Sequence, residues 1–254
     1  MNTSHLLLDI EGTTCPVSFV SDILFPYASK SLETYLGRSQ TNPMIERLLE
    51  DAEQEWEEDG TFESKSLRLA TKTNAVNRIQ AITQYLRHLT AIDRKSTVLK
   101  DIQGKIWNEG YSSGNLKSQL FEEAPSCLRR WHANNLTLAV YSSGSIEAQK
   151  LLYRHTTTGS LENLFTDWFD TKTGPKKNHE SYSNIARKMN TACDQILFIS
   201  DNGEECDAAE AAGMKTLFSL REGNPDQNPR HHRVITTLNS VDQYLETSSV
   251  AMPQ

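Results

Sequence analysis

Short apolar segments, each ending at a polar loop, set the fold that this chain can adopt. The first covers residues 5–10, and comparable segments follow only in the second half of the chain, at 136–141, 165–169, 195–199 and 215–220. Stretches of helical periodicity separate the later segments, at 145–155, 180–189 and 203–212. Apolar strands that alternate with helices are typical of a parallel sheet covered on both faces. The sequence therefore predicts an α/β fold, a doubly wound parallel sheet.

Residues 20–134 differ from the rest of the chain, because their periodicity is helical and no strand is evident. Helical stretches lie near 21–36, 44–58, 74–92 and 97–109. One predicted strand precedes this region and the others follow it, so the simplest topology is a core of residues 1–19 and 135–254 with an inserted helical cap, 20–134. Such a cap would cover the carboxyl ends of the strands, where parallel sheets bind ligands. The tail, 246–254, is expected to fray.

The composition excludes some classes of function. A chain of 254 residues can bury a catalytic cleft, and its net charge of -7 argues against a protein that mainly binds nucleic acid or an anionic membrane surface. No segment approaches the roughly 20 apolar residues of a membrane span, and residues 1–5 are too short and polar to begin a secretory signal. We expect a cytoplasmic protein, a monomer, whose partner is a small molecule.

The cysteines and histidines show no metal-binding pattern. The cysteines form no C-x-x-C pair and are expected to be reduced structural thiols: Cys15, Cys127, Cys193 and Cys206. Cys15 and Cys206 each neighbour a motif described below, and a catalytic role for either is the weaker alternative. The histidines at 88, 132, 155, 179, 231 and 232 have no spacing that demands a ligand role. We interpret them as surface or packing residues.

Two acidic residues, Asp9 and Glu11, stand at the end of the first apolar segment and are followed by Gly12. A turn at the glycine would let a carboxylate and nearby backbone groups converge on a ligand. The ordinary alternative is a solvated acidic turn, since acidic residues and glycine are common in turns.

Serines follow the second segment, at Ser142, Ser143 and Ser145. Hydroxyl and backbone N–H groups where a strand meets a helix can hold an anion, helped by the positive end of the helix. The alternative is that Ser145 simply caps the following helix.

Two further loops carry charge. Asp201 follows the fourth segment, and together with Asp9 it would offer the oxygen ligands that Mg²⁺ prefers; the alternative is an acidic helix start. The loop after the third segment contains three lysines, Lys172, Lys176 and Lys177, of which one could reach a phosphoryl oxygen. A lysine in a loop is usually solvated, so this signal is weak alone.

All the motifs described above follow predicted parallel strands, however. A nucleophile, an anion cradle, a cation and a metal ligand could therefore meet at one sheet edge.

This ordered set resembles the motifs of the haloacid dehalogenase superfamily. Within it, the chain resembles the enolase-phosphatase E1 family of methionine salvage over nearly its whole length. The segments that carry this resemblance are 8–14, 18–20, 24–27, 107, 110–111, 141–145, 148–152, 169–172 and 221–224. Glutamate at position 11, where most phosphatases of the superfamily have aspartate, is the mark of that family.

The resemblance implies an activity and a set of roles. The family enolises 2,3-diketo-5-methylthiopentyl-1-phosphate and dephosphorylates it, through an aspartyl-phosphate, to the acireductone 1,2-dihydroxy-3-keto-5-methylthiopentene. By resemblance, Asp9 would be the nucleophile and Glu11 the acid/base. Magnesium would be held by Asp9, Glu11 and Asp201, with Glu11 acting through its backbone carbonyl. Substrate would be bound by Ser142, Ser143 and Lys176, and Glu205 would support Asp201 in the fourth motif.

Several points stay open at this stage. Asn178 replaces a glutamate that the family often has two positions after the lysine, and Lys177 competes with Lys176 for the role of inward cation. The enolisation base is either Glu11 or a cap residue. Trp107 and Tyr111 either line a pocket for the methylthio tail or belong to the cap core. The rival functions are another capped phosphatase of small phosphate esters, a 2-haloacid dehalogenase, or an inactive relative that only binds ligand.

Overall fold

The computed structural model describes residues 3–246, which form two compact units. The first contains the described residues up to Val20 and from Lys117 onward, and the second is Ser21–Leu116. The second unit ends earlier than the predicted boundary at residue 134, because helix α7 (Ala124–Ala133) packs against a strand of the first unit. Of the tail predicted to fray, residues 247–254 lie outside the described part of the chain.

The first unit is built on a six-stranded sheet whose order is β3-β2-β1-β4-β5-β6, with every neighbouring pair parallel. The strands are β1 His5–Leu8, β2 Thr137–Tyr141, β3 Phe165–Phe169, β4 Ile196–Ser200, β5 Lys215–Ser219 and β6 Val234–Ile235. Strand β1 is central, and its Leu8 is in register with Val140 on β2 and Ile199 on β4. The predicted parallel α/β sheet is confirmed. Strand β6 was not predicted, because two residues are too few to form a pattern.

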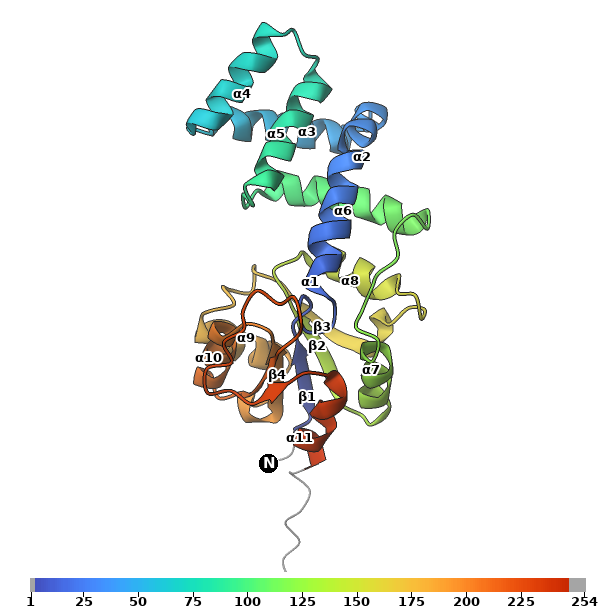
Figure 1. The fold of residues 1–254 in the computed structure, drawn as a ribbon, viewed down its shortest axis with the longest axis vertical. Helices are drawn as coiled ribbons and strands as arrows, with labels where there is room; N and C mark the ends of the chain where they lie inside the picture. Colours follow the sequence, from blue (N-terminus) through green and yellow to red (C-terminus); the bar gives the residue numbers. More distant parts are fainter. Residues whose placement is uncertain (1–2, 247–254) are drawn as a thin grey trace, which may run out of the picture. The chain divides into compact units, whose positions relative to one another are not determined.

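Helices cover both faces of this sheet (Figure 1). Helices α9 (His179–Lys188) and α10 (Gly203–Ala211) pack on each other, and α10 packs on β4 and β5. Alternate strand residues, such as Leu7, Tyr141 and Phe198, form one buried cluster with side chains of these helices. Helix α7 packs on β2, and α8 (Ile146–Arg154) packs on β3. The short α1 (Val17–Phe19) and α11 (Asp242–Glu246) complete the unit.

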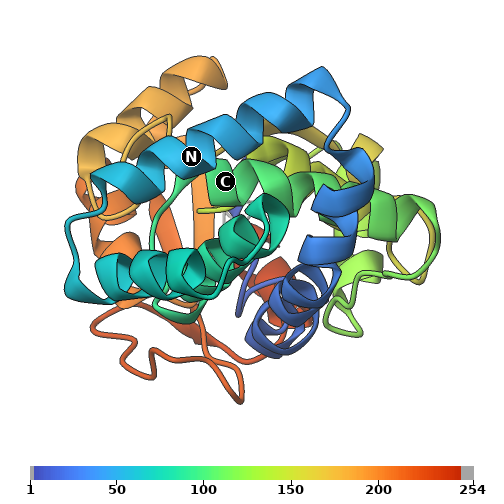
Figure 2. The ribbon, with the colours of Figure 1, turned by 90° about the horizontal axis from the view of Figure 1, so that it is seen from above.

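The second unit is helical, as predicted, and no strand is assigned within Ser21–Leu116. A π-helical turn, Val20–Leu24, leads into α2 Phe25–Ser39, α3 Pro43–Glu58, α4 Phe62–Thr73, α5 Arg78–Ala91 and α6 Thr97–Ser112. Figure 2 shows α3 in light blue and α5 in teal, which pack on each other; Trp56 stacks on Tyr85 between them with ring centroids 4.8 Å apart. Helix α4 was missed because two of its three large apolar residues, Phe62 and Leu69, are exposed and its buried positions are Ser64 and Thr71.

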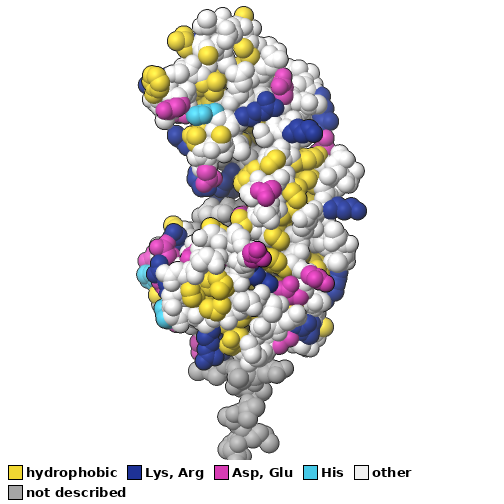
Figure 3. Space-filling view, in the orientation of Figure 1, with side chains coloured by type: hydrophobic (Ala, Val, Ile, Leu, Met, Phe, Trp, Pro, Cys, Tyr) yellow, Lys and Arg dark blue, Asp and Glu magenta, His cyan; other side chains and the backbone are white. Residues whose placement is uncertain are grey.

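Charged side chains of both signs are interspersed on the face that Figure 3 shows, without a broad area of one sign. Within the described residues, no helix combines the length and the apolar character that a membrane crossing requires.

Candidate active site

The loop after β1 is shaped by a glycine that lies against Asp201. The Asp9 N–H donates to the carbonyl of Ile199 at 3.0 Å, which continues the sheet by one residue before the chain turns. Gly12 has a φ of +68°, in the left-handed region that favours glycine. A Cβ at this position would lie 2.2 Å from Oδ2 of Asp201. The glycine therefore permits both the turn and the close approach of the loops that carry Asp9 and Asp201.

Two side chains contact the carboxylate of Asp9, those of Lys176 and Ser200. The ammonium of Lys176 lies 2.8 Å from Asp9 Oδ2 and 2.6 Å from Oε2 of Glu205. The hydroxyl of Ser200 contacts the same two oxygens, at 3.2 and 2.9 Å, so its single proton is available to either carboxylate. The other oxygen of Asp9 accepts a hydrogen bond of 2.8 Å from the N–H of Ile10. Asp9 is held in one position by these contacts.

The electrostatics of this cluster show an excess of negative charge. Burial, together with the nearby carboxylates of Asp9 and Glu205, raises the pKa of Asp201 to about 8, against the opposing effect of Lys176. Burial and Asp9 likewise raise the pKa of Glu205. Burial alone would lower the pKa of Lys176, but Asp9 and Glu205 outweigh it and raise that pKa, so the lysine is charged. One ammonium does not balance the surrounding carboxylates.

The same residues fit a hard divalent cation. The carboxylates of Asp9 and Asp201, with the backbone carbonyl of Glu11, are oxygen donors of the kind that such cations prefer. A bound cation would offset the repulsion that raises the pKa of Asp201, and it would favour the ionised carboxylates. The donor set and its unbalanced charge therefore agree with the metal site predicted from the sequence.

The serine loop follows β2, the strand next to β1. Ser142 is buried, and its N–H donates to the carbonyl of Phe169 at 3.2 Å, while Ser143 is exposed. Ser145 is the N-cap of α8 and accepts from the N–H of Ala148 at 3.3 Å, so the capping interpretation of this residue is confirmed. Register with β1 puts Ser142 at the same sheet edge as Asp9.

The side chain of Gln149 braces that loop, a role which the sequence reasoning missed. Its amide donates to the carbonyl of Gly144 at 2.8 Å and to the carbonyl of Phe169 at 2.9 Å. A buried glutamine with these two contacts ties the serine loop to the end of β3. The sequence indicated Gln149 only as part of the resemblance segment 148–152 and as a polar residue in an amphipathic helix.

The structure shows which of the three lysines lies beside Asp9, a choice that the sequence left open. The side chain of Lys176 is 10% exposed and lies in the Asp9 cluster. That of Lys177 is 61% exposed and pairs with Glu204 at the surface, and Lys172 is also exposed. The hydroxyl of Tyr182 donates to the backbone carbonyl of Lys176 at 2.7 Å, which fixes the loop at this residue. Asn178, the departure from the family pattern, is the N-cap of α9.

A second brace, from the loop after β5, holds the carbonyl of Gly12. It accepts a hydrogen bond of 3.0 Å from the amide of Asn224 and one of 2.9 Å from the hydroxyl of Ser219. Asn224 also donates to the carbonyl of Ser219 at 3.1 Å. The sequence indicated Asn224 only as part of a resemblance, because its partner is remote in the chain.

With this geometry established, similarity to known proteins becomes informative. Residues 3–213 match the haloacid dehalogenase-like hydrolases. The chain belongs to this family. It is 60% identical over 245 residues to a protein of Parasynechococcus marenigrum strain WH8102 named enolase-phosphatase E1, a match that covers 96% of this chain and 100% of the relative. The protein of that name from Aquifex aeolicus is 40% identical over 218 residues, covering 86% and 90%. The resemblance read from the sequence is confirmed.

Solved structures of other proteins are similar to this chain. The UTR4 protein of Saccharomyces cerevisiae superposes with a TM-score of 0.73 at 30% identity, covering 93% of this chain and 98% of that one. CbbY from Rhodobacter sphaeroides, solved with phosphate, has a TM-score of 0.58 at 14% identity, covering 95% and 96%, and supports the fold alone.

Neither cysteine near the motifs of this hydrolase is placed for nucleophilic chemistry. Cys15 and Cys206 are free and buried, and burial raises the pKa of both thiols well above the ordinary range. A buried thiol with a raised pKa is a poor nucleophile. Cys206 instead belongs to the hydrophobic cluster between the sheet and α10.

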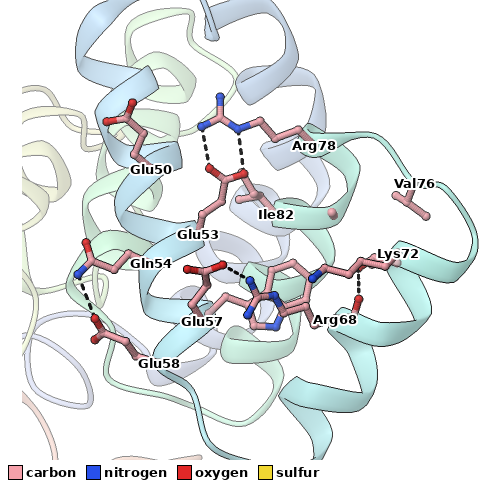
Figure 4. A pocket seen from close by; sticks show the side chains of 13 residues that line it. Glu50, Glu53, Gln54, Glu57, Glu58, Arg68, Lys72, Val76, Arg78 and Ile82 are labelled. Carbon is pink, nitrogen blue, oxygen red and sulfur yellow. Dashed lines mark hydrogen bonds and ion pairs between the residues drawn. The ribbon is translucent and has the colours of Figure 1, made fainter.

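The second unit of the hydrolase contains a cavity of about 770 Å³ between α3, α4 and α5. Figure 4 shows Arg78 bound to Glu53 and Arg68 bound to Glu57 along its wall. No residue predicted as a site residue lines it. Trp107 and Tyr111 lie elsewhere on α6: Tyr111 is buried, and the indole N–H of Trp107 donates to the carbonyl of Leu24 at 2.9 Å. Their contact with the methylthio tail stays a prediction.

Proposed function

We propose that this hydrolase enolises 2,3-diketo-5-methylthiopentyl-1-phosphate and then removes its phosphate, leaving the acireductone 1,2-dihydroxy-3-keto-5-methylthiopentene. The observation that carries the proposal is the buried contact of Asp9 with Lys176, which places a carboxylate nucleophile beside a fixed positive charge. Relatives named enolase-phosphatase E1 and the glutamate at position 11 support the choice of this substrate over other phosphate esters.

Asp9 is the proposed nucleophile for phosphoryl transfer. Its carboxylate attacks phosphorus, the bond from phosphorus to the ester oxygen breaks, and the phosphoryl group passes to Asp9. Lys176 balances the charge of the moving group, while Ser142 and Ser143 donate hydrogen bonds to its oxygens. The hydrogen bond from Ile10 and the contacts of Ser200 and Lys176 hold the carboxylate in place for the attack.

Glu11 is the proposed acid and base. It gives a proton to the departing ester oxygen, and its carboxylate then takes a proton from the water that hydrolyses the aspartyl-phosphate. Enolisation removes a proton from a carbon next to a carbonyl, and Glu11 is one candidate for that base; a residue of the second unit is the other.

The proposed cofactor is Mg²⁺, held by the carboxylates of Asp9 and Asp201 and the carbonyl of Glu11. When bound, it supplies positive charge to phosphoryl oxygens and to the enolate oxygen. Glu205 acts on the cluster through Lys176, whose ammonium lies 2.6 Å from its carboxylate.

We further propose that Ser21–Leu116 acts as the cap that selects the ester. We also propose that the enzyme is a monomer, which gel filtration tests, and that it is cytoplasmic, which cell fractionation tests.

A coupled assay tests the function. Purified protein is mixed with the diketo phosphate ester, with and without Mg²⁺, while acireductone absorbance and free phosphate are followed together. Both signals should rise only with Mg²⁺, and neither should rise with the Asp9→Asn variant. Release of phosphate from many esters, without an enol signal from this one, would instead identify another capped phosphatase of the family.

A further inference from the structure

Two adjacent histidines meet an aspartate of α10 in the first unit, and none of the three belongs to the Asp9 cluster. His232 Nε2 lies 2.8 Å and His231 Nδ1 lies 3.9 Å from Oδ1 of Asp207. One ligand atom from each residue lies within 4.8 Å of the others, and no other group of three or more His, Cys, Asp or Glu side chains among the described residues is as close. Ligand atoms of a tetrahedral zinc site, with bonds of about 2.0–2.1 Å, are about 3.3 Å apart. The distances of 2.8 and 3.9 Å from Asp207 Oδ1 to the two imidazoles lie on either side of that value.

The second nitrogen of each imidazole has its own partner. His232 Nδ1 is 2.8 Å from the hydroxyl of Thr216 on β5. His231 Nε2 pairs with the carboxylate of Glu210. In metal sites, a ligating histidine usually has its other nitrogen held in this way, which fixes the ring and leaves the first nitrogen for the metal. Both rings are therefore already oriented toward Asp207.

The surroundings leave one oxygen of Asp207 available and one side of the cluster open. Arg230 binds Oδ2 of Asp207 and so leaves Oδ1 facing the histidines. The side chain of His232 is 1% exposed, whereas that of His231 is 63% exposed, so an ion and a water molecule can enter from solvent. The carboxylates of Glu204 and Glu210 lie beside the cluster and offset the charge of Arg230.

We propose that His231, His232 and Asp207 bind a divalent transition-metal ion, and that zinc, with water as its fourth ligand, is the ion that suits this donor set. Two imidazoles and one carboxylate suit zinc, whereas magnesium prefers oxygen ligands throughout. The site and the Asp9 cluster therefore select different ions. An ion here fastens the segment between β5 and β6 to α10, the helix that also carries Glu205.

Calorimetry tests the site. Zinc chloride is titrated into the full-length protein in excess magnesium chloride, so that magnesium competes for the carboxylates around Asp9. The wild type should bind one zinc ion per chain, and His231→Ala should weaken binding by about tenfold or more. His132→Ala is the matched control, because His132 is an exposed histidine in the last turn of α7, and it should bind like the wild type. His231 is exposed, so its removal leaves the core intact.

Cobalt provides a spectroscopic readout that is independent of activity. Co²⁺ bound to the wild type should show the visible absorption of a tetrahedral site, and His231→Ala and Asp207→Asn should each lose it. The proposal is overturned if the wild type shows no saturable zinc binding in excess magnesium, or if His231→Ala binds zinc as tightly as the wild type. It is also overturned if Asp201→Asn abolishes binding that His231→Ala retains, since the ion would then lie among the carboxylates.

Discussion

Glu205 is connected to Asp9 through a single ammonium. Nζ of Lys176 lies 2.6 Å from the Glu205 carboxylate and 2.8 Å from that of Asp9, and all three side chains are buried. Glu205 comes from the first turn of α10, Asp9 from the end of β1, and Lys176 from the loop after β3. Three distant parts of the chain thus meet in one ion network, and the charge of each depends on the others.

Asp9→Asn should abolish phosphate release, by at least about 10³-fold in kcat, because an amide cannot attack phosphorus as a carboxylate does. Circular dichroism should show an unchanged fold, since the two side chains have nearly the same size. Turnover at the wild-type rate would eliminate Asp9 as the nucleophile.

Lys176→Ala should remove activity and destabilise the protein by about 3–5 kcal/mol, because Asp9 and Glu205 would be left buried without their countercharge. The matched variant is Lys177→Ala, next in the chain but exposed and paired only at the surface. It should retain activity and stability. Urea unfolding and phosphate release measure both; the reverse pattern would show that Lys177 is the active cation.

Gly12→Ala should abolish activity, because its Cβ would displace Asp201 from the loop that carries Asp9. Gly159→Ala isolates the contribution of backbone strain, since Gly159 also has a positive φ, +91°, but open space around it. Each variant should lose about 1–2 kcal/mol of stability from the left-handed backbone. Equal activity in the two variants would mean that the approach of Gly12 to Asp201 is unimportant.

Asp59 should make the second unit sensitive to acid. Burial alone would raise its pKa, but hydrogen bonds from Ser64 and from Thr61 outweigh it and lower that pKa to about 2, below the ordinary 3.8. A lowered pKa stabilises the folded state above pH 3.8, and this contribution is lost as the pH falls toward 2. Asp59→Asn should therefore cost about 1 kcal/mol at neutral pH, allowing for solvent screening, and progressively less as the pH falls through 2. Urea unfolding across this range measures the difference; a cost independent of pH would contradict it.

The sequence predicted those parts of the fold and site that local patterns determine. The inner strands β1, β2 and β4 are buried on both faces and read as apolar runs, and Asp9, Ser142 and Asp201 lie where these runs end. Helix α4 has no apolar buried stripe, so periodicity could not reveal it. The predicted helical insertion, 20–134, extends past the second compact unit, which ends at Leu116; the difference includes α7, whose packing on β2 is a contact between distant segments that the sequence does not show.

The choice between Lys176 and Lys177 required the structure. The two lysines are adjacent and chemically identical, and only the turn at Gly174 with the bond from Tyr182 determines which one points inward. The braces from Asn224 and Gln149 were hidden for a similar reason, because each joins segments that are far apart in the chain.

The central position of β1 has a consequence for synthesis of the protein. Strand β1, which Asp9 follows, leaves the ribosome before the other strands of the sheet, but both of its neighbours, β2 and β4, come after the whole helical unit. Ser21–Leu116 is one continuous stretch with its own core and can fold as soon as it emerges. Leu6, Leu7 and Leu8 have no strand partner until β2 has been made, at Tyr141, and their second partner, β4, is complete only at residue 200, so this short apolar strand needs protection from aggregation while the chain is being made.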